Sequence, residues 1–453
     1  MHRSRSIRAA VLLLALASVT VSCSGRGSDG NSSGSTAPPT GGPATSGGVD
    51  TKNCPDTGTA GISGDTITLA SSFPQSGLTG AFAQISKGYK AYFDKVNADG
   101  GVEVAGKKYK IKVVDKDDEY NASKTVGNIA EEVGTSGDKA FAVFNVVGTA
   151  NNIAIRVSLD ENCVPNLFAA TGSPAWGNPK YPWLVGSTFA PYTLEAKAFA
   201  DHLKAEQPKA KVAMLVQNDD FGKAYEEGFK NSIKGTDITV TEVAKYEAGI
   251  SNVASQVTSL AASGADVFFN GATLLACPNA LEEATANNWK RKATFVSGTC
   301  ISKTLMGIAG ENADGVFSAT NIKDPFNPAF KDDPAMKEYR ATIAKFGAKD
   351  VDADNGIVAY GYTQGVLLVK VLADSPKLTR ADVLNTLRTI DTEDQGLLLK
   401  GVKAKMSADD PFMAENLQLI QYDAAKRYFN NVGDLIDFEG KTAKLTPESL
   451  INN

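Results

Sequence analysis

Histidine is almost absent from this chain of 453 residues, which holds only His2 and His202. That scarcity argues against histidine-based metal sites and against Ser-His-Asp or Cys-His catalytic groups. Positive charge is not in excess either, because 46 basic and 51 acidic residues leave a net charge of −5 and no basic footprint for nucleic acid. The sequence therefore predicts neither a cofactor, nor a metal, nor a nucleic-acid partner.

Wholesale disorder is also excluded by the composition. Hydrophobic residues make up 42% and charged residues 21% of the chain, as in soluble globular proteins. The length is two to three times that of a usual domain, so the chain can bury a sizeable core and is expected to divide in two.

The first 22 residues have the layout of a secretory signal. Arg3, Arg5 and Arg8 precede an apolar run over residues 9–17, and small residues follow up to Cys23. A cysteine at this place resembles a bacterial lipobox, in which cleavage occurs before the cysteine and its sulfur receives lipid. The alternative is ordinary cleavage nearby and a free Cys23.

The residues after Cys23 predict a flexible tether over 23–63. Of the 25 residues in 24–48, 20 are Gly, Ser, Thr or Pro, a composition that cannot bury a core. Lipid and tether together predict an extracytoplasmic protein that is anchored to the cell membrane.

The body of the chain alternates strands with helices. Apolar runs predict strands, and apolar positions at helical spacing predict the helices between them. The expected strands are 65–70, 108–115, 140–147, 164–170, 211–216, 239–246, 266–270 and 293–297. The expected helices are 81–101, 122–133 with Asn121 as N-cap, 150–159, 192–206, 222–233, 251–262 and 277–288. This order predicts an α/β fold with two parallel sheets, each with helices on both faces.

Five loops at the expected carboxyl ends of strands are rich in Gly, Ser and Thr. They are SSFPQSGLTG, VGTANN, ATGSPAWG, NGATLL and SGTC. Ligands of open parallel sheets sit beyond these strand ends, and such loops offer hydroxyls and close backbone approach. Any one loop can be only a tight turn, but five together predict a binding cleft.

Ordered blocks along the chain resemble a known family. The blocks TITLASSFPQSGLTGAFAQISKGYKAYFDKVNADGGV, KYKIKVVDKDDEYNASKTVGNIAEEV, VPNLFAATGSP and VAMLVQNDDFGKAYEEGF are similar to type I periplasmic binding proteins. The most similar subgroup is leucine-binding-protein-like and serves ABC importers of branched-chain amino acids and amides. The resemblance implies two similar lobes joined by three crossover strands, with lobe 1 over 64–190 and 320–415 and lobe 2 over 191–319 and 416–453.

The function implied by the resemblance is capture without chemistry. A small solute, such as a branched-chain amino acid, an amide or a related compound, would close the two lobes, and an ABC permease would receive it from a monomeric binding protein. One alternative is a ligand sensor on the same fold that signals to a receptor or regulator. Another is a secreted α/β hydrolase, for which the chain lacks a GxSxG elbow.

The resemblance also implies ligand-binding residues. It places them at loop ends of both lobes, namely at Ser76, Phe82, Gly148, Thr149, Thr171, Ser173, Phe221, Thr273 and Thr299. Phe82 and Phe221 can instead be ordinary core aromatics. Thr299 stands where amino-acid binders of the family carry an acid for the ligand ammonium, which leaves Asp219 or Asp220 as the alternative partner for an ammonium and keeps other solutes open.

The four remaining cysteines are expected to form two disulfides in an oxidising compartment. Zinc binding is the competing idea, but the cysteines lack CxxC spacing. Cys277 and Cys300 each follow the end of sequential strands on the cleft side, which predicts that they pair. Cys54 and Cys163 each precede a strand, and they are paired by elimination.

Overall fold

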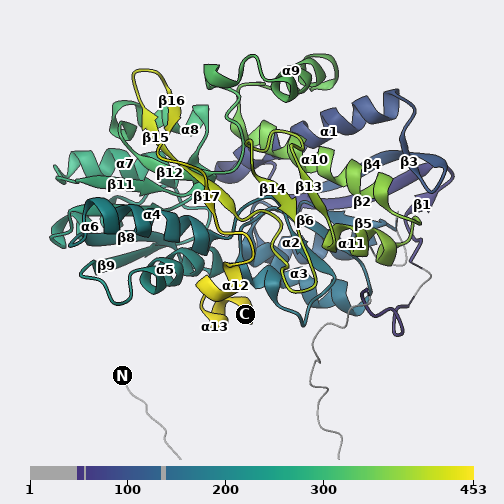
Figure 1. Cartoon of the computed structure of the whole chain (residues 1–453), viewed down its shortest axis with the longest axis horizontal. Coiled ribbons are helices and arrows are strands. Elements are labelled where there is room, and N and C mark those ends of the chain that lie inside the picture. The colour runs from purple at the N-terminus through teal and green to yellow at the C-terminus, as the bar shows by residue number, and fades with distance from the viewer. Residues whose placement is uncertain (1–47, 56–57, 134–138) are drawn as a thin grey trace, which may run out of the picture. The chain divides into compact units, whose positions relative to one another are not determined.

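The computed structural model describes residues 48–55, 58–133 and 139–453. The predicted signal, Cys23 and most of the tether lie outside these residues. Within them, the strands and helices predicted up to residue 297 occur in the predicted order, and with the later elements they build two large sheets (Figure 1). The predicted α/β fold class is confirmed.

The first sheet is built from the N-terminal part of the chain. Its order is β3-β4-β2-β5-β6-β7, with β1 added beside β2. The strands are β1 (Ile62–Ser63), β2 (Thr66–Phe73), β3 (Val102–Val104), β4 (Lys107–Asp117), β5 (Ala142–Phe144), β6 (Asn166–Ala169) and β7 (Leu184–Gly186). The pairs from β4 to β7 are all parallel, as expected for strands that alternate with helices.

The second sheet takes strands from the middle and from the end of the chain. Its order is β16-β15-β12-β11-β10-β8-β9, with β17 beside β15. The strands are β8 (Lys211–Gln217), β9 (Thr239–Tyr246), β10 (Val267–Gly271), β11 (Ala293–Val296), β12 (Phe317–Thr320), β15 (Asn416–Asp423), β16 (Tyr428–Asn431) and β17 (Ile436–Asp437). The pairs from β9 to β12 are parallel, whereas β15 pairs antiparallel with β12. A short hairpin of β13 (Asp391–Glu393) and β14 (Lys403–Lys405) stands apart from both sheets.

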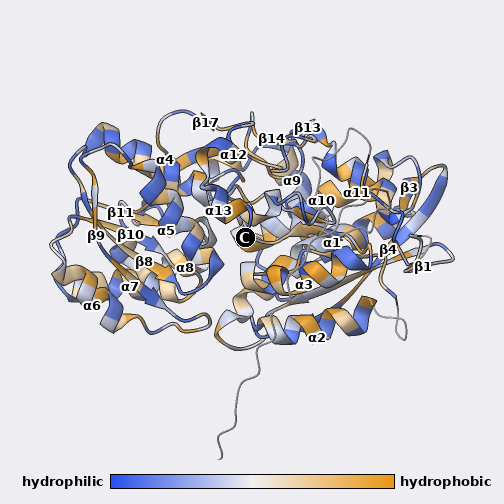
Figure 2. Cartoon of the chain, turned by 90° about the horizontal axis from the view of Figure 1, so that it is seen from below, coloured by the Kyte–Doolittle hydropathy of each residue, from blue (hydrophilic) through white to orange (hydrophobic). Residues whose placement is uncertain are grey.

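Helices pack on the strands of both sheets, and Figure 2 shows that they carry both hydrophobic and hydrophilic residues. The longer helices of the first half are α1 (Ala83–Ala98), α2 (Ala122–Val133), α3 (Thr149–Glu161), α4 (Tyr192–Glu206) and α5 (Asp220–Ser232). The later helices are α6 (Ala254–Ala262), α7 (Ala276–Ala286), α8 (Lys303–Ala309), α9 (Pro334–Phe346), α10 (Gly356–Asp374), α11 (Arg380–Arg388), α12 (Thr442–Leu445) and α13 (Glu448–Ile451). The predicted cap is confirmed, because Asn121 Oδ1 accepts from the backbone N–H of Ser123 at 2.9 Å.

Three connections carry the chain between the two sheets. They follow β7, follow β12 and precede β15, and α9 and α10 pack on α1 between the last two. Buried side chains tie the first two connections together. The Nε2 atom of Gln364 on α10 donates to Thr188 Oγ1 at 2.6 Å, and Asn321 Nδ2 donates to the Thr188 carbonyl at 2.6 Å. The Thr188 backbone N–H also donates to Gln364 Oε1 at 3.3 Å, so both backbone groups of this buried residue have partners.

Both predicted disulfides are present. Cys54 is bonded to Cys163, and Cys277 is bonded to Cys300, with Cα–Cα distances of 5.5 and 6.1 Å. The first bond attaches residues N-terminal to β1 to the first sheet, and the backbone N–H of Val49 donates to Asn385 Oδ1 at 3.0 Å. Residues 49–54 are therefore held against the body, although the tether was predicted to reach residue 63.

Helix α10 has the length and hydropathy of a membrane span, but most of it is buried inside the protein. It packs on α1 through glycines whose backbones are in direct contact. A Cβ atom added at Gly88 would lie 2.1 Å from the Val358 carbonyl oxygen, and one added at Gly361 would lie 1.9 Å from the Ile85 oxygen. We conclude that α10 is a core helix and that the two glycines set its distance from α1.

We expect Gly88→Ala to lower the free energy of unfolding by roughly 2–4 kcal/mol, because the added methyl group forces α1 and α10 apart. Gly127 is the matched control, since it lies within α2 with open space around it. Gly127→Ala should raise the free energy of unfolding by about 0.5–1 kcal/mol through lower entropy of the unfolded chain. Urea denaturation followed by circular dichroism measures both, and equal effects would contradict the close approach.

Candidate functional site

A cavity of about 110 Å³ lies where the two sheets and their connections meet. Its wall is mainly apolar and comes from α1, α10, the connections and β15. The apolar residues include Phe82, Ile85, Phe189, Ile322, Ile357 and Leu417. Since a cavity of about 150 Å³ holds benzene, this one has room for a small branched alkyl group or a similar body.

Two of the predicted ligand residues line this cavity, one from each side. Phe82 directly precedes α1, is 8% exposed and stacks on Tyr120 with 5.9 Å between ring centroids. Thr299 comes from the turn after β11 and is half-buried. The cavity thus brings together the first loop of one sheet and a late loop of the other.

The other predicted residues lie elsewhere. Thr149 and Thr171 are buried, and their hydroxyl oxygens are 2.6 Å apart. Gly148 caps α3 with a φ of 102°, a conformation that favours glycine. Ser76 is exposed and donates to Asp117 at 2.5 Å. None of these four lines the 110 Å³ cavity.

The remaining second-lobe and loop residues also lie outside it. Phe221 is buried and packs edge-on against Tyr192, with ring centroids 5.0 Å apart. Thr273 is 7% exposed, and its hydroxyl has no hydrogen-bond partner among the residues that the structure describes. Ser173 lines a second space of about 10 Å³ beside Trp176, which is too small for more than one water molecule. A ligand role for these residues stays a prediction.

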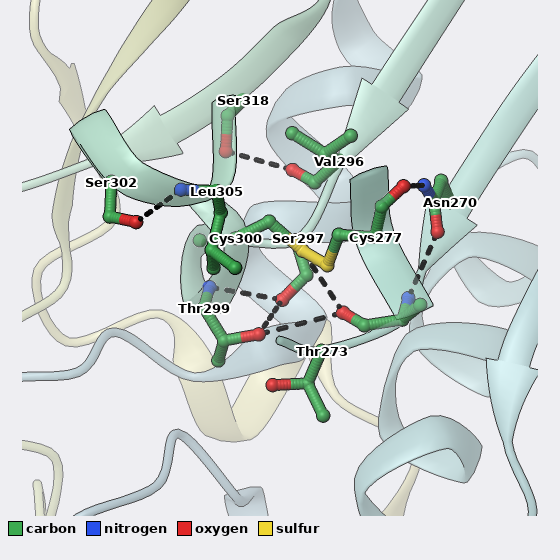
Figure 3. The surroundings of a disulfide bond; sticks show 12 residues. Asn270, Thr273, Cys277, Val296, Ser297, Thr299, Cys300, Ser302, Leu305 and Ser318 are labelled. Atoms are coloured by element: carbon green, nitrogen blue, oxygen red, sulfur yellow. Dashed lines mark hydrogen bonds between the residues drawn. A yellow bond between two sulfur atoms is a disulfide. The ribbon is translucent and has the colours of Figure 1, made fainter. Parts of the chain in front are cut away.

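The turn that carries Thr299 is held by the Cys277–Cys300 disulfide (Figure 3). The Thr299 backbone N–H donates to Ser297 Oγ at 3.1 Å, and the two side-chain hydroxyls are 2.9 Å apart. On the other side of the bond, Asn270 Nδ2 donates to the Cys277 carbonyl at 3.1 Å. The disulfide and these hydrogen bonds hold the neutral hydroxyl of Thr299 at the wall of the 110 Å³ cavity.

Glu195 is a cavity residue that sequence reasoning missed. It lies in the first turn of α4, is 2% exposed and lines the cavity beside Thr299. Its Oε2 atom accepts from the Tyr225 hydroxyl at 2.7 Å and from the Gly298 backbone N–H at 2.9 Å. Burial raises its pKa from 4.5 to about 7, although both hydrogen bonds oppose the change. Strand β7 ends at Gly186, shortly before this helix, but the sequence analysis did not predict that strand, so no strand-end loop pointed to Glu195.

The aspartates proposed as alternatives to Thr299 are engaged elsewhere. Asp219 caps α5 by accepting from the backbone N–H groups of Phe221 and Gly222. Asp220 accepts from Asn453 Nδ2 at 2.8 Å. Neither lines the cavity, so Glu195 is the described carboxylate next to Thr299 on its wall.

Tyr120 does not line the cavity, but its ring stacks on that of Phe82, which does. It follows β4 with a φ of 62°, a left-handed conformation that Asp118 supports by accepting from its backbone N–H at 2.9 Å. Burial raises the Tyr120 pKa, and the Asp219 charge adds to this rise. Tyr120 therefore reaches from the first sheet to the loop after β8 of the second. Its place at the carboxyl end of a parallel strand was a usable signal.

Comparison with known proteins decides the family. The sequence profile described as "periplasmic binding protein" matches residues 66–427, most of the chain. This chain belongs to the periplasmic binding protein family.

Several relatives of this periplasmic binding protein are recorded. A Leu/Ile/Val-binding protein homologue of Brucella melitensis is 26% identical over 272 residues, which are 59% of this chain and 70% of the relative. A branched-chain amino acid ABC transporter protein of Thermus thermophilus with bound valine has a TM-score of 0.73 at 17% identity, over 83% and 97% of the two chains. A fatty acid ABC transporter substrate-binding protein of Thermomonospora curvata has a TM-score of 0.73 at 19% identity, over 85% and 96%.

The family membership confirms the predicted role as a solute-binding protein, and the likeness to the solved structures confirms the predicted type I fold. It also implies a location outside the cytoplasm. The relatives are binding proteins rather than enzymes, so the hydrolase alternative gains no support, and the sensor alternative is not favoured.

Glu195→Gln should change how stability depends on pH. Between pH 4.5 and 7 the folded wild-type protein keeps a proton on Glu195 that the unfolded chain has lost, so its free energy of unfolding falls as pH rises. Glutamine does not titrate, so the free energy of unfolding of the variant should not show this fall. Relative to the wild type, it should therefore rise by about 3 kcal/mol between pH 4.5 and 7. Urea denaturation at a series of pH values measures it, and a constant difference would contradict the burial of the charge.

Proposed function

We propose that this chain captures a small solute with an apolar body, of the size of a branched-chain amino acid or its amide, and delivers it to an ABC permease. The observation that supports this is the 110 Å³ apolar cavity, whose wall is shared by both sheets and the connections between them. A solute in such a place touches both lobes at once. The closed form then gains contacts that an open form lacks, and a permease can distinguish the two.

The ligands named for two similar proteins also have apolar bodies, like the solute proposed for this chain. The protein from Thermus thermophilus holds valine, and the protein from Thermomonospora curvata is a fatty acid transporter's binding protein. The cavity volume favours the smaller of these bodies here. The proposed lobes are 64–190 with 320–415 and 191–319 with 416–453. This division is supported by the two sheets, because β2 to β7 fall in the first lobe and β8 to β11 and β15 to β17 fall in the second.

We further propose that the mature chain begins at Cys23, that its sulfur carries lipid, and that the protein acts as a monomer held near the membrane. The three arginines, the apolar run and the small residues before Cys23 support lipidation. The Gly, Ser, Thr and Pro residues that follow support a flexible link to the body.

Binding is tested by calorimetry and thermal shift on the exported chain carrying Cys23→Ser, against branched-chain amino acids, other amino acids, short amides and aromatic carboxylates. We expect a branched-chain solute to raise the melting temperature. Phe82→Ala should weaken the binding of this solute at least tenfold, because it removes the contact between the phenyl ring and the solute. A loss of about 1.4 kcal/mol of binding free energy corresponds to a tenfold loss of affinity. Leu78→Ala is the matched control in the same loop, where the side chain is 53% exposed, and should leave affinity unchanged. If no solute in the panel stabilises the protein, the proposed solute class is wrong.

Lipidation is tested separately in a bacterial host. Mass spectrometry of the N-terminal peptide should find diacylglycerol on Cys23, and the protein should fractionate with membranes. Cys23→Ser should release it into the soluble extracytoplasmic fraction without altering solute binding. An unmodified Cys23 peptide in the wild-type protein would refute the anchor.

A further inference from the structure

Glu195 stands out in the cavity wall because its charge is only partly compensated. Both of its hydrogen-bond donors, the Tyr225 hydroxyl and the Gly298 backbone N–H, are neutral, and both reach Oε2. No hydrogen bond or ion pair within the described residues reaches Oε1. A carboxylate has about four acceptor sites, so a buried one with two donors retains capacity for more.

Three basic side chains line the same cavity. Two of them form ion pairs with aspartates, and the third lies near a tyrosine. Lys303 pairs with Asp352 at 3.4 Å and with Asp354 at 3.3 Å. Lys323 pairs with Asp333 at 2.8 Å. Arg427 lies near Tyr422, whose pKa is raised by burial in spite of the opposing Arg427 charge. The compensation that Glu195 lacks is therefore not supplied by these side chains.

We propose that Glu195 determines specificity by accepting, through Oε1, a hydrogen bond from a primary ammonium group on the solute, whose apolar body fills the cavity. This inference rests on the proposed function and narrows its ligand to an amine-bearing solute. The partner of the ammonium group would then lie on α4. Thr299, in the neighbouring turn, offers only a hydroxyl group. An ammonium at this point would neutralise the buried charge that two neutral donors leave in place.

The raised pKa of Glu195 makes the proposal measurable through protons. An ammonium-bearing solute binds the ionised form, so binding near pH 6.5 should release protons from Glu195. Affinity should therefore rise between pH 6 and 8. Other groups that face Glu195 or share its cavity are Tyr192, Tyr225, Lys303, Lys323, Asp324 and Arg427. Asp324 has a pKa of about 6, so the Glu195→Gln variant is needed to isolate the contribution of Glu195.

The experiment compares three probes that share one branched alkyl body. They are L-leucine, 3-methylbutylamine, which lacks the carboxylate, and 4-methylpentanoate, which lacks the ammonium. Calorimetry of the exported chain with Cys23→Ser, in phosphate and in Bis-Tris at pH 6.5, gives affinity and proton release. In the wild type we expect both amines to bind at least tenfold more tightly than 4-methylpentanoate and to release protons.

Glu195→Gln should weaken both amines at least tenfold, abolish the proton release and leave 4-methylpentanoate within twofold. Glu206→Gln on the exposed end of α4 removes the same charge from the same helix and should change nothing. Gly298→Ala is a second variant, which keeps the Glu195 charge but moves it. The added Cβ would lie 2.9 Å from Glu195 Oε1 and would displace the carboxylate. It should also weaken the amines.

Two outcomes overturn the inference, and they are distinguishable. If 4-methylpentanoate binds the wild type as tightly as L-leucine and Glu195→Gln alters neither, Glu195 does not select the ligand, while the proposed function stands. If none of the three probes binds the wild type, the proposed branched-chain solute class fails, and the ammonium site fails with it.

Discussion

The hydrogen bonds around Thr188 are the constraint on which the two-sheet arrangement depends. A chain that passes between sheets must take backbone groups through the interior, where an unsatisfied carbonyl or N–H is costly. Here Asn321 and Gln364 supply the missing partners, and Thr188, Asn321 and Gln364 are all buried. The first two connections and helix α10 are thereby fixed to one another. The place where they meet is also the place where the cavity forms.

The cavity follows from this junction. Phe189 and Ile322 come directly after Thr188 and Asn321 on the two connections, and both line its wall. Helix α10 contributes Ile357, and it is held close to α1, the helix of Ile85, by the contact at Gly88 and Gly361. The apolar wall is therefore assembled from segments that the hydrogen bonds and the glycines already position. A change at Gly88 is expected to act on the site as well as on stability.

The sequence predicted the elements well because their signals are local. Helix α4 has the predicted bounds 192–206, and the eight predicted strands occur in the predicted order, although β7 and the strands after residue 297 were not predicted. Phe82 and Thr299 also came from blocks of local resemblance, and both line the cavity. Glu195 has no such signal, since its contact with Gly298 joins residues 103 positions apart on different elements. Such a contact depends on how α4 packs beside β11, which no local period encodes.

The cost of burying Glu195 argues that it acts in binding rather than in folding. Two neutral donors hold the carboxylate in place, but burial still raises its pKa, so the folded protein is less stable with the charge than without it near neutral pH. A glutamine could accept the same two hydrogen bonds without that cost. A residue that only supported the Gly298 turn would therefore have little need of its charge. The charge becomes useful only when a cation enters the cavity, and the energy gained in neutralising it then favours the closed form that holds the solute.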